Sequence, residues 1–415
     1  MSSLHKTGMQ TKSVIAKEES FQEAKIKLTL TKLYIFNFLI GFSLISGVLI
    51  PFYLIYGGFT FFEFMLLQSY YAIVVIVLEI PCALIADKIS KKFALILAGI
   101  SYLFVPFAYG IVSNKFLFFI GETFFAFSNA LISGTNEAFI YENLKSIGKE
   151  KNIMKFLARN DGMFLLGLVI SAPLGSIIAN LVSIQFIVLL MILPYAASLI
   201  IILTIHSTGR SSINVPNKSS SIQILKSGLK ELWKNKVLKI LVFEKVIIEI
   251  VIVFLVYTYQ YYILMEFNIP IFYFGFIDAG LTLSQFTFLN LIPHLADASI
   301  NRKKILFANT IIPGIGYLLI GVINFAPAVI FLFLIIIGLG LSRYIIFTNG
   351  INRQIKQGNR TTILSTISVI SGILKAFLYP IVGFLVMINI SFLYVLLGVF
   401  ILVVALKSRV KKEYL

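Results

Sequence analysis

Acidic side chains interrupt several long apolar stretches of this sequence, and their type and spacing point to chemistry. The densest set is Glu122, Asn129, Ser133, Asn136 and Glu137. At about 100° per residue, all five fall on one stripe of a continuous helix. A carboxyl group shielded from water readily holds a proton, because desolvation disfavours its charged form. We therefore expect a cavity wall with Glu122 or Glu137 as proton carrier; the alternative is that these side chains bond to neighbouring helices or are hydrated at a helix end.

Further ionisable residues lie in other apolar stretches, where a charge costs at least about 2.5–3.5 kcal/mol at a bilayer centre. Lys245 and Glu249 are four residues apart and are predicted to neutralise each other. Lys375 needs a carboxylate partner or a hydrated cavity. Its candidate partners are Glu122, Glu137 and Asp278.

Glu79 and Asp278 complete the set of candidates. Glu79 lies eleven residues after Gln68 on the same helical face, and Asp278 shares a face with Thr282 and Gln285. The candidates for proton coupling or cavity lining are thus Glu79, Glu122, Asn129, Glu137, Glu249, Asp278 and Lys375. No metal site is predicted, since the three histidines are far apart in sequence and the chain has one cysteine.

The stretches that carry these residues are long enough to cross a membrane. Hydrophobic residues make up 59% of the 415-residue chain and charged residues 13%, against about 45–50% and about 25% in a soluble domain. A span needs roughly 20 mostly apolar residues. Twelve runs reach that length: 32–56, 61–86, 93–112, 116–141, 158–181, 184–205, 238–263, 271–293, 305–324, 328–348, 362–387 and 390–407. The sequence therefore predicts an all-α integral membrane protein with twelve transmembrane helices.

Basic residues predict the orientation of these spans. Cytoplasmic connections collect Lys and Arg, and here the connections after even-numbered spans are longer and basic, whereas those after odd-numbered spans are short. Only Lys115 lies on the other side, and Lys245 and Lys375 fall inside spans. Both termini are then predicted to be cytoplasmic, in a multi-pass protein of the cell (inner or plasma) membrane. The net charge of +17 reflects this topology and contact with anionic lipid rather than nucleic-acid binding.

The chain divides into two pseudo-symmetric halves of six spans. The predicted parts are a cytoplasmic tail at 1–31, a first half at 32–205, a linker at 206–237, a second half at 238–407 and a tail at 408–415. The linker ends in an amphipathic stretch, with Leu225, Leu229 and Leu232 on one face, which predicts an interfacial helix. Two similar segments support the division: IPCALIADKISKK follows span 2 and IPHLADASINRKK follows span 8.

The topology and one loop resemble the major facilitator superfamily of secondary transporters. The family signature between spans 2 and 3 is Gly-x-x-x-Asp-Arg-x-Gly-Arg-Lys. The corresponding positions here are Ala83, Asp87, Lys88, Ser90, Lys91 and Lys92. By this resemblance, Asp87, Lys88, Lys91 and Lys92 form a cytoplasmic gate that closes in the outward-facing state. The sequences EIP, before this loop, and SGTNEAFIYENL, at the end of span 4, resemble a bacterial efflux-type branch.

Two positions depart from the drug–proton antiporters of this superfamily. Span 4 carries Glu122 and no Arg, and the span 5 motif Gly-x-x-x-Gly-Pro-x-x-Gly-Gly is reduced to small residues around Pro173. The favoured expectation is proton-coupled export of a small amphipathic compound, a drug or secreted metabolite, by alternating access. The alternatives are a proton symporter for a nutrient and, in another class, a non-transporting membrane receptor or scaffold.

Signals of enzymatic chemistry are missing from the sequence. It contains no zinc-protease HExxH motif, no glycine-rich phosphate loop of the Walker type and no cysteine pair. We therefore expect neither an enzyme nor a cofactor. The expected partners are a small-molecule substrate, protons and the lipid bilayer, and the expected assembly is a monomer.

Overall fold

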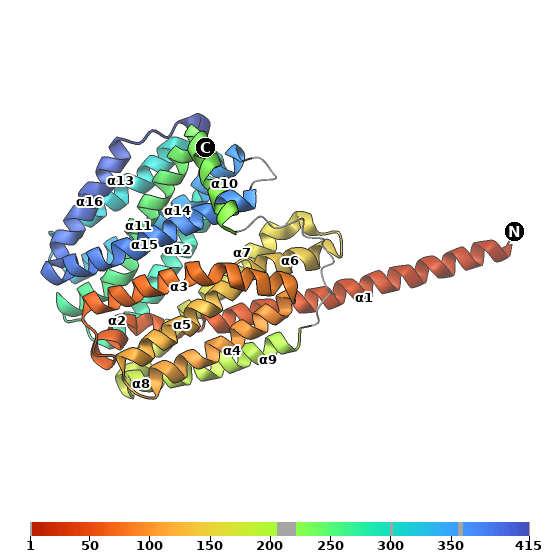
Figure 1. Ribbon diagram of the computed structural model, residues 1–415, viewed down its shortest axis with the longest axis horizontal. Helices are drawn as coiled ribbons and strands as arrows, with labels where there is room; N and C mark the ends of the chain where they lie inside the picture. Colours follow the sequence, from red (N-terminus) through yellow and green to blue (C-terminus); the bar gives the residue numbers. More distant parts are fainter. Residues whose placement is uncertain (1, 206–220, 299–301, 356–359, 415) are drawn as a thin grey trace.

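The computed structural model describes residues 2–205, 221–298, 302–355 and 360–414, whose arrangement is shown in Figure 1. Every regular element in these ranges is helical, so the all-α prediction is confirmed. Nine stretches of the described part are long and apolar enough to cross a membrane, and Ile390–Leu406 is a shorter apolar helix. The count of twelve spans stays a prediction.

The helices follow the predicted runs in order. The first half contains α1 (Ser2–Gly41), α2 (Leu49–Pro51), α3 (Phe61–Lys88), α4 (Lys91–Gly110), α5 (Lys115–Ile132), α6 (Thr135–Lys145), α7 (Ile153–Leu181), α8 (Ile184–Leu190) and α9 (Ile192–Leu203). Single turns at Ser46–Val48 (η1), Phe52–Tyr56 (η2) and Glu150–Asn152 (η3) lie between them. The linker contains α10 (Ser221–Lys234). The second half contains α11 (Lys236–Met265), α12 (Ile271–Ala298), α13 (Arg302–Ile320), α14 (Ala326–Gln354), α15 (Arg360–Ile388) and α16 (Ile390–Leu406), and η5 (Lys412–Tyr414) lies in the C-terminal tail.

Polar residues in the connections fix where several helices begin. Thr60 N donates to Glu63 Oε2 over 2.8 Å and Glu63 N donates to Thr60 Oγ1 over 3.2 Å, which makes a capping box at the start of α3. Ser90, Asn114 and Asn389 accept from backbone N–H groups at the starts of α4, α5 and α16, over 3.0, 2.8 and 2.8 Å. These bonds satisfy N–H groups that have no partner within the helix.

The first predicted span, 32–56, is not one continuous helix. α1 ends at Gly41, and η1, α2 and η2 follow as separate short turns. Neighbouring backbone fills the space beside the break: a Cβ on Gly41 would lie 2.2 Å from Phe164 O, and one on Gly47 would lie 2.7 Å from Ala172 O. Glycine at these two positions lets α7 approach the broken segment closely.

Predicted spans 4 and 6 are also divided. α5 ends at Ile132 and α6 begins at Thr135, because Gly134 between them has a φ of 71°, a conformation that ends an α-helix. The prediction of one continuous polar stripe along span 4 is therefore wrong beyond Ile132. Span 6 breaks at Met191, where the ring of Pro194 would clash with the carbonyl of a helix continuing from α8.

Two segments predicted as polar contain helix. α1 begins at Ser2 and continues into the first span with Leu30 buried, so residue 31 marks no element boundary. α10 forms where the amphipathic pattern predicts a helix, and it packs on α15: a Cβ on Gly228 would lie 2.0 Å from Thr366 Oγ1. The rest of the linker, 206–220, lies outside the described residues, as do three residues of the second repeat segment, 299–301.

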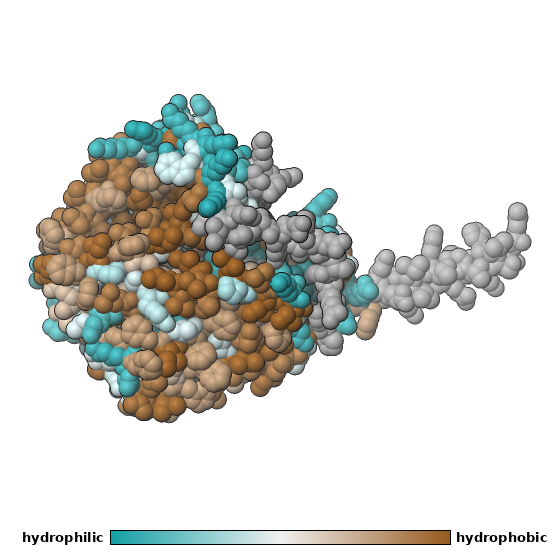
Figure 2. All heavy atoms as spheres, in the orientation of Figure 1, coloured by the Kyte–Doolittle hydropathy of each residue, from teal (hydrophilic) through white to brown (hydrophobic). Residues whose placement is uncertain are grey.

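The outside of the bundle suits a membrane. Figure 2 shows hydrophobic residues over most of the visible face, with hydrophilic residues gathered at its upper end and along one lower edge. Many large apolar side chains on the helices are exposed, among them Val77, Phe104, Phe331, Phe377 and Phe400. A soluble protein rarely exposes so much contiguous apolar surface, whereas a helical bundle in lipid presents such a surface and satisfies its backbone polar groups internally.

Candidate functional site

The halves meet along α3 and α15, and burial changes steadily along this contact. Near the short connections, the Ser69 hydroxyl donates to Ala376 O over 2.5 Å, and both residues are buried. Farther along α3, Glu79 is half-buried and Ala83 is exposed. On α15, Ser365 is likewise exposed. The two helices therefore separate toward the charged connections, and Glu79 lies where they separate.

The second contact between the halves, α7 with α12, shows the same change. The Ser176 hydroxyl donates to Phe272 O over 2.9 Å, and a Cβ on Gly275 would lie only 2.0 Å from Ala172 O. At the other end of this face of α12, Asn290 is exposed. The molecule is thus closed between its halves at the end with short connections and open toward the end with long, basic ones.

Glu122 lies buried in the first half, held by a tyrosine from the broken first span. Its side chain is 3% exposed, and Oε1 accepts a hydrogen bond from the Tyr53 hydroxyl. The Tyr109 ring lies 6.4 Å from the Tyr53 ring and packs on Gly121, where a Cβ would lie 2.3 Å from Tyr109 Cε1. Glycine before Glu122 thus makes room for an aromatic wall around the carboxylate.

The other polar residues of predicted span 4 have separate surroundings. Asn129 donates to Phe125 O over 2.9 Å and accepts from the Tyr102 hydroxyl over 3.3 Å. Asn136 donates to Asn37 Oδ1 over 2.9 Å, which joins α6 to α1. Glu137 lies in the first turn of α6 and is exposed. Bonding between helices therefore describes the two asparagines, whereas Glu137 is exposed at the start of α6.

Asp278 is a carboxylate of the second half that is likewise held by a tyrosine. Its Oδ1 accepts from the Tyr259 hydroxyl over 2.6 Å, and that hydroxyl accepts from Gln260 Nε2 over 2.9 Å. Gln260 also reaches the broken first span, because its Nε2 donates to Ser46 O and its Oε1 accepts from Ile50 N, each over 2.9 Å. These bonds satisfy backbone groups in the broken span, as a low-dielectric interior requires.

The broken first span therefore lies between the two carboxylates. Tyr53, in η2, bonds to Glu122 in its own half, and the turns just before it bond to Gln260 of the other half. Gln260 in turn bonds to the tyrosine that holds Asp278. The broken first span is thus bonded directly to Glu122 and, through Gln260 and Tyr259, to Asp278.

The lysines inside the second half have contacts that were not predicted. Lys375 Nζ lies 3.8 Å from Glu249 Oε1. Lys245, predicted to neutralise Glu249, interacts with it electrostatically, and its ammonium lies 4.4 Å from the centre of the Tyr344 ring. Residues from α11, α12 and α14, including Lys245, Glu249 and Gln285, line a cavity of about 210 Å³. Lys375 does not pair with any of the three carboxylates proposed for it. Its partner is Glu249, because α11 and α15 pack together.

Arg343 is a buried cation that the sequence analysis missed. It lies in α14, is 4% exposed and stacks over Phe347 with 5.0 Å between the guanidinium carbon and the ring centre. It lies within an apolar run, GLGLSRYIIF. An ionisable residue inside an apolar span is a functional candidate, and Lys245 and Lys375 were selected on the same ground. Arg343 thus joins Lys245 and Lys375 as a basic residue well inside a span.

The predicted gate segment joins α3 to α4. Asp87 and Lys88 occupy the last turn of α3 and are exposed. Lys91 Nζ lies 2.5 Å from Glu142 Oε1, and Lys92 Nζ donates to Leu203 O over 3.1 Å at the end of α9. Lys91 and Lys92 therefore bind within their own half, where Lys92 also meets the negative end of a helix dipole.

Comparisons with known proteins agree with this architecture. The nucleoside transporter NupG, as a point mutant, superposes with a TM-score of 0.77 at 13% identity, covering 91% of this chain and 98% of that one. A POT family transporter in complex with 5-aminolevulinic acid gives 0.74 at 14% identity, with 92% and 94% covered. A D-xylose–proton symporter gives 0.71 at 12% identity, with 94% and 99% covered. At these identities the likeness shows the fold alone, and no curated protein matches the chain.

The sequence itself gives the family. Residues 33–377 match the family described as Major Facilitator Superfamily, which covers most of the chain and both halves of the bundle. The long apolar helices and this match together make the protein a multi-pass membrane protein with a transporter fold. The chain belongs to the Major Facilitator Superfamily.

Proposed function

We propose that the protein is a secondary active transporter that couples proton movement to the export of a small amphipathic compound. One observation carries the proposal: the broken first span lies between two tyrosine-held carboxylates, Glu122 and Asp278, one in each half. Proton carriers in transporters are typically such intramembrane carboxylates near the interface between halves.

The proposed cycle rocks one half against the other. The conformation closed at the short connections and open at the basic ones corresponds to an inward-facing state if the basic connections are cytoplasmic. Reaching the outward-facing state requires breaking the bonds from Ser69 to Ala376 and from Ser176 to Phe272. Protonating Glu122 adds an O–H donor to a group that could only accept, which changes its bond with Tyr53 and hence the position of the broken span.

Aromatic rings form a row that is mostly buried in this conformation, with Phe64 at 0% and Tyr53 at 2% exposed, and that separation of the halves would offer to an amphipathic substrate. Tyr53 contacts Phe64 with ring centres 4.8 Å apart, Phe64 contacts Tyr257 at 5.9 Å, and Tyr257 contacts Tyr379 at 5.5 Å. This row crosses from the first half to the second and ends one helical turn from Lys375. Flat apolar faces beside charged groups suit a molecule that is part apolar and part polar.

Export is the proposed direction because the EIP and SGTNEAFIYENL segments resemble an efflux-type branch. Uptake by proton symport is the second candidate, and one neighbouring fold is a D-xylose–proton symporter. A receptor or scaffold is disfavoured, because it has no need of two buried or half-buried carboxylates. The proposal also holds the protein to be a monomer of the cell membrane without enzymatic activity.

The sign of proton movement tests the proposal and separates the two directions. Purified protein is reconstituted in vesicles with a pH dye inside, and ethidium, uridine or D-xylose is added outside with no pH gradient imposed. Antiport makes the lumen more alkaline as the compound enters, whereas symport makes it more acidic. A compound that enters without any pH change would exclude proton coupling for that compound.

The orientation has its own test, in a variant with Cys82 replaced by alanine. A membrane-impermeant maleimide added to intact cells should label Lys115→Cys, which lies at a short connection, and should leave Lys412→Cys unlabelled. Loss of the surface ion pair between Lys115 and Glu63, 2.7 Å apart, should cost about 0–1 kcal/mol at most. The reverse labelling pattern would place the basic connections outside.

The cytoplasmic gate remains a proposal that rests on the loop signature. Asp87→Asn removes a negative charge from the last turn of α3, and we expect slower transport with an unchanged amount of folded protein. Transport rate and protein yield are compared with Glu150→Gln, a change of charge in the next basic connection. Equal rates for the Asp87 variant and the unaltered protein would remove Asp87 from the gate.

A further inference from the structure

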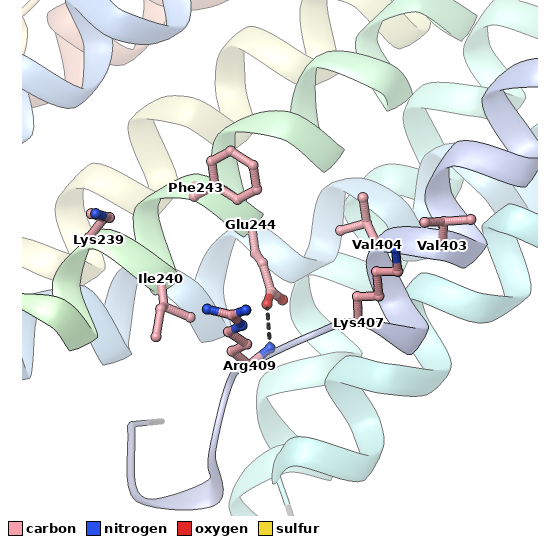
Figure 3. A pocket seen from close by; sticks show the side chains of 8 residues that line it. All are labelled: Lys239, Ile240, Phe243, Glu244, Val403, Val404, Lys407 and Arg409. Atoms are coloured by element: carbon pink, nitrogen blue, oxygen red, sulfur yellow. Dashed lines mark hydrogen bonds between the residues drawn. The ribbon is translucent and has the colours of Figure 1, made fainter.

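A pocket of about 400 Å³ lies where α11 begins and α16 ends, at the basic end of the second half (Figure 3). Its polar side chains come from α11 and from the C-terminal segment that follows α16. The cations are Lys239, Lys407 and Arg409. In Figure 3, Lys239 and Lys407 lie at opposite sides of the pocket, with Arg409 between them. The pocket does not include any residue of the proposed transport site.

The pocket has an apolar side as well as a charged one. Ile240 and Phe243 of α11 face Val403 and Val404 of α16 in its wall. Phe243 is 60% exposed and Val403 is 42% exposed, so the apolar side is open to the surroundings of the bundle rather than sealed within it. Both lie one to two turns inside the helix ends.

An exposed tryptophan beside the pocket indicates that its cations lie at headgroup level, and two of these cations have no ion-pair partner in the described part of the chain. Trp233 is 67% exposed, and the Lys239 ammonium lies 4.4 Å from the centre of its ring. Exposed tryptophans of membrane proteins concentrate at the interface between water and lipid. Among the described residues, neither the Lys407 ammonium nor the Arg409 guanidinium forms an ion pair. These two charges are thus available to an anion.

One carboxylate, Glu244, also borders the pocket, but it is already engaged. It is 7% exposed, and its two oxygens accept from the Ser408 hydroxyl over 2.8 Å and from Arg409 N over 3.1 Å. Figure 3 draws the second of these bonds. Glu244 therefore holds the chain after α16 in place and fixes the position of the Arg409 backbone. Three cations and one carboxylate line the pocket, so its net charge is positive.

We propose that this pocket binds an anionic glycerophospholipid, with its phosphate at Lys239, Lys407 and Arg409 and an acyl chain along Phe243 and Val403. Guanidinium and ammonium groups bind phosphate through charge-assisted hydrogen bonds, and basic pockets between helices at the cytoplasmic side suit anionic headgroups. A free phosphate would use only the cations, whereas a lipid uses both sides of the pocket.

Native mass spectrometry of the purified full-length chain tests the site with phosphatidylglycerol, phosphatidylcholine and glycerol phosphate as probes. The pocket variant carries Lys239→Gln, Lys407→Gln and Arg409→Gln. The control carries Lys236→Gln, Lys411→Gln and Lys412→Gln, which removes as many charges from the same end of the molecule outside the pocket. Each pocket charge is expected to contribute roughly fivefold in affinity, so the triple variant should bind phosphatidylglycerol on the order of a hundredfold more weakly.

The expected result is tighter binding of phosphatidylglycerol than of phosphatidylcholine in the unaltered protein and in the control, with that preference lost in the pocket variant. Should the triple variant fail to fold, Lys407→Gln and Arg409→Gln are measured singly, each with a fivefold loss expected. A preference that survives in the pocket variant, or an equal loss in the control, overturns the site. Displacement of the lipid by an equal concentration of glycerol phosphate overturns the acyl contact, and with it the assignment to a lipid.

Discussion

Replacing Glu122 by glutamine is expected to abolish substrate-linked proton movement while the protein stays folded. Glutamine has the size of glutamate and can accept the hydrogen bond from Tyr53 through its amide oxygen, but it cannot take up or release a proton. Because the side chain is only 3% exposed, a neutral group there also avoids the cost of desolvating an ion, so thermal stability should not fall.

The vesicle assay with an internal pH dye measures this effect. For any compound that shifts luminal pH with the unaltered protein, Glu122→Gln should give the response of empty vesicles. Glu413→Gln, an exposed carboxylate after α16, is the matched control and should give the full response. Full coupling in Glu122→Gln together with its loss in Asp278→Asn would transfer the role of proton carrier to Asp278.

Replacing Gly275 by alanine is expected to open the end of the molecule that is closed in this structure. The added Cβ would lie 2.0 Å from Ala172 O and 2.4 Å from Ser176 Oγ, across the contact between α12 and α7. A backbone oxygen cannot move aside as the tip of a side chain can, and overpacking typically costs about 1–3 kcal/mol. That cost falls on the closed state alone, so a value of about 2 kcal/mol would depopulate it roughly 30-fold relative to a state in which the contact is separated.

Labelling of a cysteine inside the contact region measures the shift. Ser69 is 7% exposed in the closed contact between α3 and α15. In a variant with Cys82→Ala and Ser69→Cys, Gly275→Ala should raise the rate of labelling by an external impermeant maleimide and slow transport. Gly280→Ala is the control on the same helix, since its Cβ would meet only Leu334 Cδ2, at an ordinary 3.4 Å. Equal labelling rates in the two alanine variants would show that this contact does not govern opening.

Local patterns in the sequence were enough to predict most of the helices. Apolar runs of membrane-spanning length became helices, and the capping residues Thr60, Ser90 and Asn114 lie one to three residues before the predicted starts at 61, 93 and 116. Intramembrane charge was also visible in the sequence, and applying the same rule throughout would have included Arg343. These features depend on a residue and its near neighbours in the chain, which is why one sequence reveals them.

Only the tertiary structure decided how the functional groups are arranged. Gly134 adopts a positive φ that ends the predicted span 4 and separates Glu122 from Glu137, although glycine in a helical pattern does not by itself require a break. The partner of Lys375 is Glu249, and the tyrosine that holds Glu122 comes from a first span that the hydropathy pattern presents as continuous. Such pairings depend on distances between residues that are far apart in the chain, and helix packing fixes these distances. The sequence by itself therefore determined the apolar spans and the charges within them, whereas packing determined which charges meet.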